Sequence, residues 1–302
     1  MKIKDMGFLF ILAAMWGSSF LFMRVSSPVL GPFMVIELRV LIAGLALLAY
    51  SAFTKHKRNL LKMWKQYLLL GTINAAIPFT LIATATLTLN ASLASILNST
   101  TPLFGVLVAW LWMKESLTLK KTIGVIIGIT GVIILIGWSP FPLTLKVVMA
   151  ATLSILAAIS YAFGGVYAKK TFKGIDSLSL AIGQQLGAAI LLFPIAFAKI
   201  PTKPISSTII FSILALALVC TAVAYILYFY LIESVGPTKT LTVTFLVPLF
   251  GVLWGVIFLR ESITFGTLIG LVVILSSIFI MSDIKVKQIS NKVSKDNTYR
   301  EG

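Results

Sequence analysis

Charged and reactive side chains are scarce in this chain of 302 residues. It has nine acidic residues, one histidine and one cysteine, and charged residues make up 11% of the total. The single cysteine, Cys220, excludes an intrachain disulfide. His56 and Cys220 cannot form a metal site by themselves, and no HExxH, CxxC or GxSxG pattern occurs. The sequence therefore predicts that the protein is not an enzyme and carries neither a metal nor a cofactor.

Apolar residues are correspondingly abundant. They account for 59% of the chain, and the mean hydropathy is +1.03. A soluble core could not bury this much apolar surface, so we predict an all-α protein whose solvent is the lipid bilayer. Ten segments are long enough to cross it as helices. They cover residues 6–23, 33–53, 67–87, 91–113, 122–137, 147–168, 178–197, 208–232, 239–259 and 265–281.

The basic residues are unevenly distributed along the chain. The net charge of +16 would suggest a nucleic-acid partner in a soluble protein. Here, alternate connections collect most lysines and arginines on one side, from Lys2 and Lys4 to the basic tail at 285–302, while Arg24 falls on the other. Positive loops stay in the cytoplasm. We therefore predict cytoplasmic N- and C-termini, a disordered cytoplasmic tail at 285–302, and no nucleic-acid partner.

The chain contains an internal repeat. The residues PLFGVL at 102–107 return 146 positions later at 248–253, and Lys114-Glu115 returns as Arg260-Glu261. Five helices per half is an odd number, so the second half must enter the membrane upside down. This predicts two inverted five-helix repeats, at 1–143 and 144–284. We expect Glu115 and Glu261 to lie at opposite faces and to cap their own helix ends.

These motifs resemble those of the drug/metabolite transporter superfamily, in particular its EamA-type members. The likeness rests on Trp16-Gly17, on Arg39 and on the two repeated blocks, and it extends over roughly residues 5–283. It implies a ten-helix carrier in the cell (inner) membrane that moves a small metabolite, often outward. It also implies a cavity lined by helices one, three, four, six, eight and nine. Trp16 and Arg39 are matched in the other half by Tyr161 and Gln184, so we expect asymmetric substrate contacts.

Three prolines are candidate helix breaks. Pro78, Pro102 and Pro248 each leave the carbonyl four residues earlier without its helical donor. The residues that carry these carbonyls are Asn74, Asn98 and Thr244. Unpaired polar groups are costly in hydrocarbon, so these residues should face protein or a watery cavity. We predict that Asn98 and Thr244 form a midplane pair in a substrate cavity, with Asn74 nearby. The alternative is a kink packed against a neighbouring helix.

Four aromatic residues lie away from the ends of their helices. Interfacial aromatic residues gather at the membrane surfaces, whereas Trp16, Tyr161, Tyr225 and Tyr228 fall deeper in their spans. Their rings could stack on a planar or cationic solute in the cavity. Ordinary packing between helices is the alternative.

Two ionisable residues fall within a predicted span. Glu37 and Arg39 lie near the start of the second helix and, two positions apart, point to different faces. One hypothesis makes Glu37 a proton-coupling residue and Arg39 an outer-gate or anion contact. The other makes both of them anchors at the helix end.

Together these patterns predict a secondary-active carrier that works by alternating access. We expect export of an amino acid or related solute. The energy would come from a gradient, because the sequence has no ATP-binding loop. The expected partners are the solute and the bilayer, and the chain would act as a monomer or a homodimer. A translocase for a lipid or lipid-linked sugar on the same fold is the main alternative, followed by a membrane enzyme and a channel.

Overall fold

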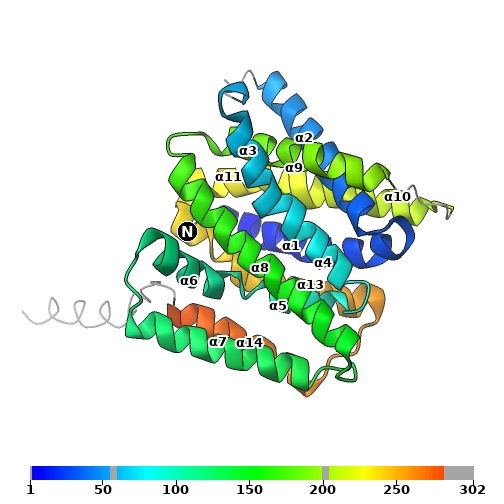
Figure 1. Ribbon diagram of the computed structural model, residues 1–302, viewed down its shortest axis with the longest axis vertical. Helices are drawn as coiled ribbons and strands as arrows, with labels where there is room; N and C mark the ends of the chain where they lie inside the picture. Colours follow the sequence, from blue (N-terminus) through cyan, green and yellow to red (C-terminus); the bar gives the residue numbers. More distant parts are fainter. Residues whose placement is uncertain (1, 55–59, 199–203, 282–302) are drawn as a thin grey trace, which may run out of the picture.

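The computed structural model describes residues 2–54, 60–198 and 204–281, in which all regular structure is helical (Figure 1). Eight helical runs in these residues are long and apolar enough to cross a membrane, and two shorter apolar helices follow. The prediction of an all-α membrane protein is confirmed at this level. Each of the ten predicted segments overlaps one of these runs. His56 and the predicted tail at 285–302 lie outside the described residues.

The first half contains five runs, several of them interrupted. They are α1 (Ile3–Leu30), α2 (Pro32–Phe53), the run of η1 (Leu61–Met63), α3 (Trp64–Gly71), η2 (Thr72–Ala76) and α4 (Ile77–Ala85), the pair α5 (Ala91–Asn98) and α6 (Thr101–Met113), and α7 (Leu119–Gly137). The second half repeats this order. It has α8 (Leu145–Thr171), α9 (Ser177–Phe197), the run of α10 (Ser207–Leu214), η3 (Ala215–Val223) and α11 (Ala224–Val235), then α12 (Pro237–Thr240), α13 (Val243–Leu259) and α14 (Phe265–Met281).

Helix α1 is longer than predicted. It continues past residue 23 to Leu30 and ends at Gly31, whose φ of 78° suits a residue without a side chain. Arg24, which the charge pattern placed in a connection, therefore lies inside the helix. Its guanidinium donates a hydrogen bond to the backbone oxygen of Thr86, so the charge does not require a loop.

The three prolines predicted to break helices lie in different local structures, and the prediction is wrong for Pro248. Pro78 follows the π-helical turn η2, and Pro102 is the second residue of α6, where a missing N–H costs no helical bond. Pro248 lies inside α13, and the helix is not broken there. The second half instead leaves the helical path before Val243, at Leu241 and Thr242.

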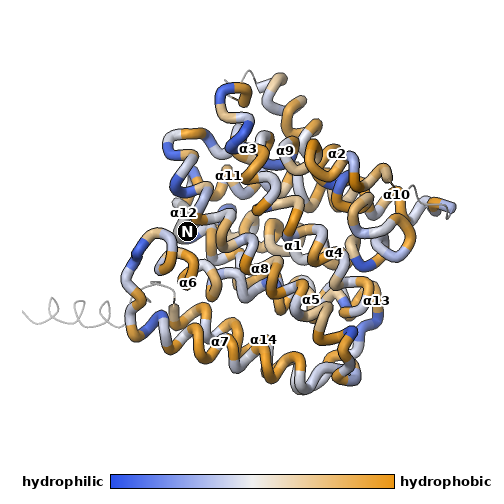
Figure 2. Tube along the Cα trace, viewed as in Figure 1, coloured by the Kyte–Doolittle hydropathy of each residue, from blue (hydrophilic) through white to orange (hydrophobic). Residues whose placement is uncertain are grey.

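The two halves are interleaved rather than stacked as separate bundles. Helix α2 packs along α9, α1 along α13 and α7 along α14, while α8 lies against both α4 and α6 (Figure 1). Helix α3 also packs against α9 so closely that a Cβ on Gly71 would lie 2.5 Å from the backbone nitrogen of Ala188. Hydrophilic residues gather near the helix ends, and apolar residues fill the middle (Figure 2).

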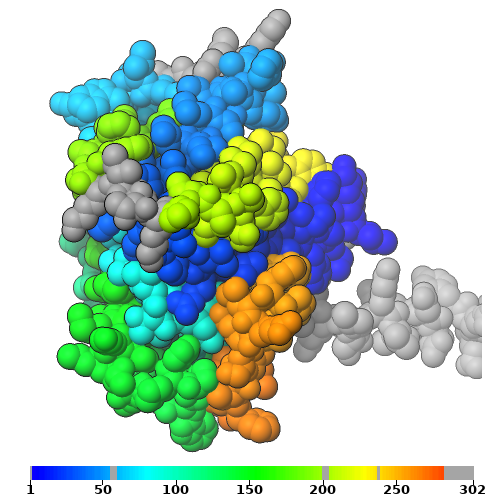
Figure 3. Space-filling view, turned by 90° about the vertical axis from the view of Figure 1, so that its right-hand side faces the viewer, coloured from blue at the N-terminus to red at the C-terminus, as the bar shows by residue number. Residues whose placement is uncertain are grey.

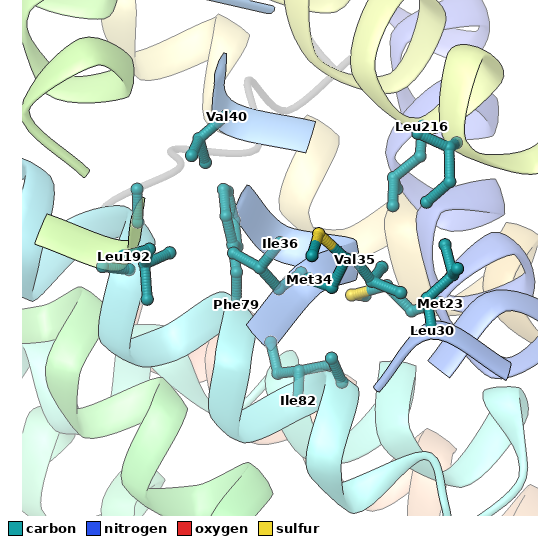
Figure 4. Close-up of a cluster of buried hydrophobic side chains, with 14 of the residues drawn as sticks. Met23, Leu30, Met34, Val35, Ile36, Val40, Phe79, Ile82, Leu192 and Leu216 are labelled. Atoms are coloured by element: carbon teal, nitrogen blue, oxygen red, sulfur yellow. The ribbon is translucent and has the colours of Figure 1, made fainter. Parts of the chain in front are cut away.

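The beginning of α1 and the end of α14 lie on the same side of the molecule (Figure 1). A buried apolar cluster fills the opposite end, between α1, α2, α4 and η3. Its members include Met23, Met34, Ile36, Ile82 and Leu216, none more than 7% exposed (Figure 4). This cluster closes the end of the molecule that faces away from the termini.

Candidate functional site

A cavity of about 900 Å³ lies between the two halves. This volume is within the range of sites that enclose a whole small molecule. Its wall includes residues of α1, α2, α4, α5, α6, α8, α9, α11, α13 and α14, so both halves contribute to it.

Most of the predicted site residues lie on this wall. They are Trp16, Arg39, Asn74, Asn98, Pro102, Tyr161, Tyr225, Tyr228, Thr244 and Pro248. Glu37 and Pro78 are buried in the protein and do not belong to the wall. The structure thus brings ten of the predicted residues around one space and leaves two outside it.

A chain of hydrogen bonds crosses the wall from the first half to the second. The Asn74 Nδ2 donates to Gln184 Oε1 at 2.6 Å, and Gln184 Nε2 donates to the Tyr225 hydroxyl at 2.7 Å. Asn74 fits there because a Cβ on Gly164 would lie only 2.5 Å from its Oδ1. These bonds hold three polar groups in fixed positions at the cavity.

The predicted pair Asn98 and Thr244 occupies the same wall from α5 and α13. The backbone carbonyl of Asn98 accepts the Thr101 hydroxyl at 2.7 Å, while its side-chain Oδ1 has no hydrogen-bond partner among the described residues. The Thr244 hydroxyl donates to the Leu241 carbonyl at 2.8 Å. The freed backbone carbonyl of Asn98 thus has a local donor, and its buried side-chain Oδ1 has none among the described residues.

Aromatic rings form much of the remaining wall. Trp16 lies 5.4 Å from Tyr228 and 6.5 Å from Tyr225, measured between ring centroids, and Tyr161 lies 6.0 Å from Phe79. These contacts come from α1, α4, α8 and α11. The aromatic residues therefore pack against each other and also face the cavity, so the two alternatives predicted for them are compatible.

Arg39 is the one charged side chain on the described part of the wall. Its guanidinium carbon lies 3.6 Å from the centroid of the Phe79 ring, and its Nε donates to Thr221 Oγ1 at 3.0 Å. Nη1 also contacts the Met23 sulfur at 3.8 Å. The residue is 4% exposed and has no carboxylate partner within ion-pair distance among the described residues.

Glu37 points away from this site. It is fully buried, and neither carboxylate oxygen has a hydrogen-bond partner within the described part of the chain. The structure therefore separates the two ionisable residues of α2, as their spacing predicted. A direct role for Glu37 in contacting a solute in this cavity has no geometric support.

The cavity reaches one end of the molecule and stops short of the other. Its wall includes Ser177 at the start of α9 and Met281 at the end of α14, on the side of the termini. At the opposite end, which Figure 3 faces, α1 and α13 border a separate hollow of about 520 Å³ that shares no lining residue with this cavity.

The two repeated glutamates have different partners at these two ends. Glu261 accepts the backbone N–H of Ala91 at 2.7 Å, the N–H of Ser92 at 3.0 Å and the Ser92 hydroxyl at 2.5 Å. It therefore caps α5 of the first half, which corrects the prediction that it caps its own helix. Glu115 forms an ion pair with the exposed Lys169, and its Oε1 lies 3.3 Å from the lysine Nζ.

Phe79, which covers the Arg39 guanidinium, was not singled out from the sequence, because it carried no signal beyond its bulk. Gln184 was identified only as the repeat counterpart of Arg39, and the structure places both residues on the same wall.

Several apolar helices around a central cavity define a multi-pass membrane transporter. The sequence profile of the EamA-like transporter family matches residues 5–137 and 148–283. The chain belongs to the EamA-like transporter family.

Relatives that match most of the chain include two that are named as transporters. The chain is 29% identical to "Uncharacterized transporter YvbV" of Bacillus subtilis, over 93% of this chain and 92% of that protein. It is 26% identical to "Protein PecM" of Dickeya dadantii, over 97% and 96%. It is 27% identical to "Uncharacterized inner membrane transporter YedA" of Escherichia coli K12, over 82% and 81%. A protein of known crystal structure has the same fold, with a TM-score of 0.64, 16% identity and coverage of 93% and 96%.

Proposed function

We propose that this protein is a secondary-active carrier that exports a small metabolite, an amino acid or related solute, by alternating access. The observation that carries the proposal is the cavity of about 900 Å³, which both halves line and which shares no lining residue with the hollow at the end away from the termini. A carrier needs such a space, because its solute must be enclosed between two alternating openings.

The proposed topology has ten spans in two inverted repeats, at residues 1–143 and 144–284. The reciprocal packing supports it: α3 against α9 is matched by η3 against α2, and α1 against α13 by α8 against α6. The backbones of the two motifs also agree. Lys114 and Arg260 have φ of 56° and 54°, and the N–H that follows each donates to the carbonyl of Ala109 or Gly255.

We place the protein in the inner membrane of the cell. The distribution of its basic residues supports a topology with both termini in the cytoplasm. Lys2, Lys4, Lys120, Lys121 and Lys170 belong to helix ends or connections on the side of the termini. The cavity then opens to the cytoplasm, where a solute for export would enter. The same polarity supports outward transport.

The site proposed for the solute consists of Trp16, Asn74, Asn98, Tyr161, Tyr225, Tyr228 and Thr244, with Arg39 as a contact. Asn98 offers the sharpest test, because the residue lies on the wall and its buried side-chain Oδ1 has no hydrogen-bond partner among the described residues. We expect Asn98→Ala to weaken solute binding while the protein still folds.

Counterflow in proteoliposomes tests this function. A panel of labelled amino acids and small metabolites is added outside vesicles that hold the unlabelled compound, with Asn98→Ala as the site variant. Saturable accumulation of one class, reduced at least about 10-fold in the variant, supports the carrier. A flux that does not saturate and shows no counterflow indicates a channel. Labelled lipid that changes leaflet while every soluble solute fails indicates a lipid translocase.

A further inference from the structure

The charge of the cavity wall narrows the class of solute. Arg39 brings a positive charge to the wall, and the described wall contains no aspartate or glutamate. A buried cation without a counter-ion is costly, and an anion bound beside it offsets that cost. An ammonium group in the same cavity would find no carboxylate.

The surroundings of Arg39 fix the direction from which an anion can approach. The Phe79 ring covers one face of the guanidinium, and Nε already donates to Thr221. Both contacts hold the guanidinium plane in place, and Nη2 donates no hydrogen bond to any described residue. A planar fork with fixed orientation is suited to a carboxylate, which it can bind through two parallel hydrogen bonds.

The rest of the described cavity wall has neutral polar groups and rings. Gln184, the repeat counterpart of Arg39, is held by Asn74 and Tyr225. Trp16 and Tyr228 lie 5.4 Å apart beside this network and offer a surface on which a planar ring can pack. The two positions related by the repeat thus provide one charged and one neutral polar side chain on the same wall.

We propose that the transported solute is an organic anion with a carboxylate at Arg39 and an aromatic body among the rings of the wall. This inference rests on the carrier function proposed above and restricts its solute class. An amine is not required for recognition. Amino acids without an aromatic side chain should be poor substrates.

Three compounds of similar shape test the inference on purified protein. Phenylacetate, phenylacetamide and phenethylamine present an anion, a neutral amide and a cation on the same ring. Binding is measured from the concentration dependence of the melting temperature. Phenylacetate should bind at least about 10-fold more tightly than the amide, because a charge-assisted bond distinguishes them. Phenethylamine should bind most weakly.

Arg39→Gln separates recognition from a structural role. It should abolish the preference for phenylacetate over phenylacetamide while binding of the amide persists, and Arg39→Lys should restore part of the preference. A variant that loses both ligands to the same extent, or keeps the preference, overturns the assignment, and so does tighter binding of phenethylamine by the wild type. If none of the three binds saturably, the aromatic-anion class is wrong, and the counterflow panel decides the carrier function separately.

A second inference comes from the closed end, where Glu261 joins the two halves. Its carboxylate receives three donors from the first turn of α5, and a negative charge at a helix N-terminus is additionally stabilised by the helix dipole. Gly255 makes room for this contact, since a Cβ there would lie 2.3 Å from Glu261 Oε2. We call the contact of Glu261 with Ala91 and Ser92 the Glu261 clamp.

The equivalent position at the other end has fewer hydrogen-bond donors for a glutamate and less space around it. Adding 146 to the clamp residues of α5 gives Pro237 and Thr238, and proline has no N–H to donate. Subtracting 146 from Gly255 gives Ala109, so the first repeat has a Cβ at the position where the clamp requires a glycine. An equivalent clamp by Glu115 would therefore have fewer donors and less room.

We infer that the Glu261 clamp holds the end away from the termini shut, and that its imperfect counterpart biases the protein toward the state with the cavity open on the side of the termini. The inference deepens the alternating-access mechanism proposed above. Breaking the clamp should shift the population toward the opposite opening.

Cysteine labelling measures this population without any transport assay. In a Cys220→Ala background, Ser95→Cys and Leu241→Cys report on the two ends, since they are repeat counterparts that are 0% and 51% exposed. A small water-soluble maleimide should label residue 241 at least about 10-fold faster than residue 95. Glu261→Gln should narrow this ratio by about 10-fold, the order expected for a charge-assisted hydrogen bond. Glu115→Gln is the matched control and should leave it unchanged.

An unchanged ratio in a monodisperse Glu261→Gln protein overturns the clamp, even where counterflow persists and the carrier function stands. Should Glu261→Gln fail to fold, Ser92→Ala removes one donor and keeps the charge. It should narrow the ratio in the same direction by a smaller factor. A ratio that Ser92→Ala leaves unchanged would also contradict the clamp.

Discussion

Corresponding positions of the two sequence repeats lie in opposite surroundings. Ser95 on α5 is completely buried, whereas Leu241, its counterpart before α13, is 51% exposed. Glu261 is bound to three donors, whereas Glu115 pairs with one exposed lysine. The motif backbones are alike, with positive φ at Lys114 and Arg260. The duplicated sequence therefore specifies the local bend, and the neighbouring residues decide which end closes.

The largest effect is expected for Gly255→Ala, which places the residue of the first repeat into the second. The new Cβ would lie 2.3 Å from Glu261 Oε2 and 2.6 Å from Ser92 Oγ, so the clamp must open. Overpacking together with the lost hydrogen bonds should lower the free energy of unfolding by about 3 kcal/mol. Unfolding in mixed detergent micelles measures this, and the matched change Ala109→Gly should cost about 1 kcal/mol or less. Equal losses for the two variants would show that the ends do not differ in this way.

A smaller effect is expected for Glu261→Gln. The amide oxygen can still accept a hydrogen bond from α5. The substitution removes the negative charge that strengthens the three hydrogen bonds accepted by the Glu261 carboxylate. The free energy of unfolding should fall by about 2 kcal/mol, a typical value for hydrogen bonds to a charged group. The same unfolding assay checks it, and the difference should persist at high salt because the contact is partly buried. A difference that vanishes in salt would mean that the contact behaves as a surface pair.

Ser92→Ala sharpens the comparison further, since it removes a single donor. Glu261 keeps its bonds to the N–H groups of Ala91 and Ser92, so the helix cap survives. A loss of about 1 kcal/mol is expected from one hydrogen bond. In a double-mutant cycle with Glu261→Gln, the two effects should not add, because both act on the same contact. Strict additivity would contradict the contact.

Glu115→Gln should have the smallest effect. The side chains of Glu115 and Lys169 are 40% and 67% exposed, and exposed ion pairs contribute less than about 1 kcal/mol. We expect a change within about 0.5 kcal/mol that disappears at high salt. A loss as large as that of Glu261→Gln would mean that Glu115 also forms a strong contact at its own end.

Much of the architecture could be predicted from composition and repetition. Apolar runs identify where helices can cross the bilayer, since lipid leaves few alternatives for the backbone. The predicted polar and aromatic residues Asn74, Asn98, Tyr161 and Tyr225 lie on one wall because each is deep in its span. Whether they bind the solute remains a prediction, and so does the inverted topology.

Other features depended on contacts that leave no local pattern. The partner of Glu261 is a pair of backbone N–H groups 170 and 169 residues away, and any helix start offers such groups. The charge of Arg24 indicated a connection between helices. Arg24 instead lies within α1, and the backbone oxygen of Thr86, 62 residues later, accepts its hydrogen bond. Gln184 became interpretable only once the structure placed it beside Asn74 and Tyr225.

The seam between α3 and α9 has a mechanical consequence. A Cβ on Gly71 would lie 2.5 Å from the Gln184 carbonyl, and one on Gly187 would lie 2.5 Å from the Tyr67 carbonyl, so the two backbones touch. Helices in such contact cannot slide or separate without leaving a void that neither lipid nor a side chain fills. We therefore expect α3 and α9 to move together as one rigid body, although α3 belongs to the first repeat and α9 to the second. The rigid parts of this transporter therefore cut across the duplication that produced it.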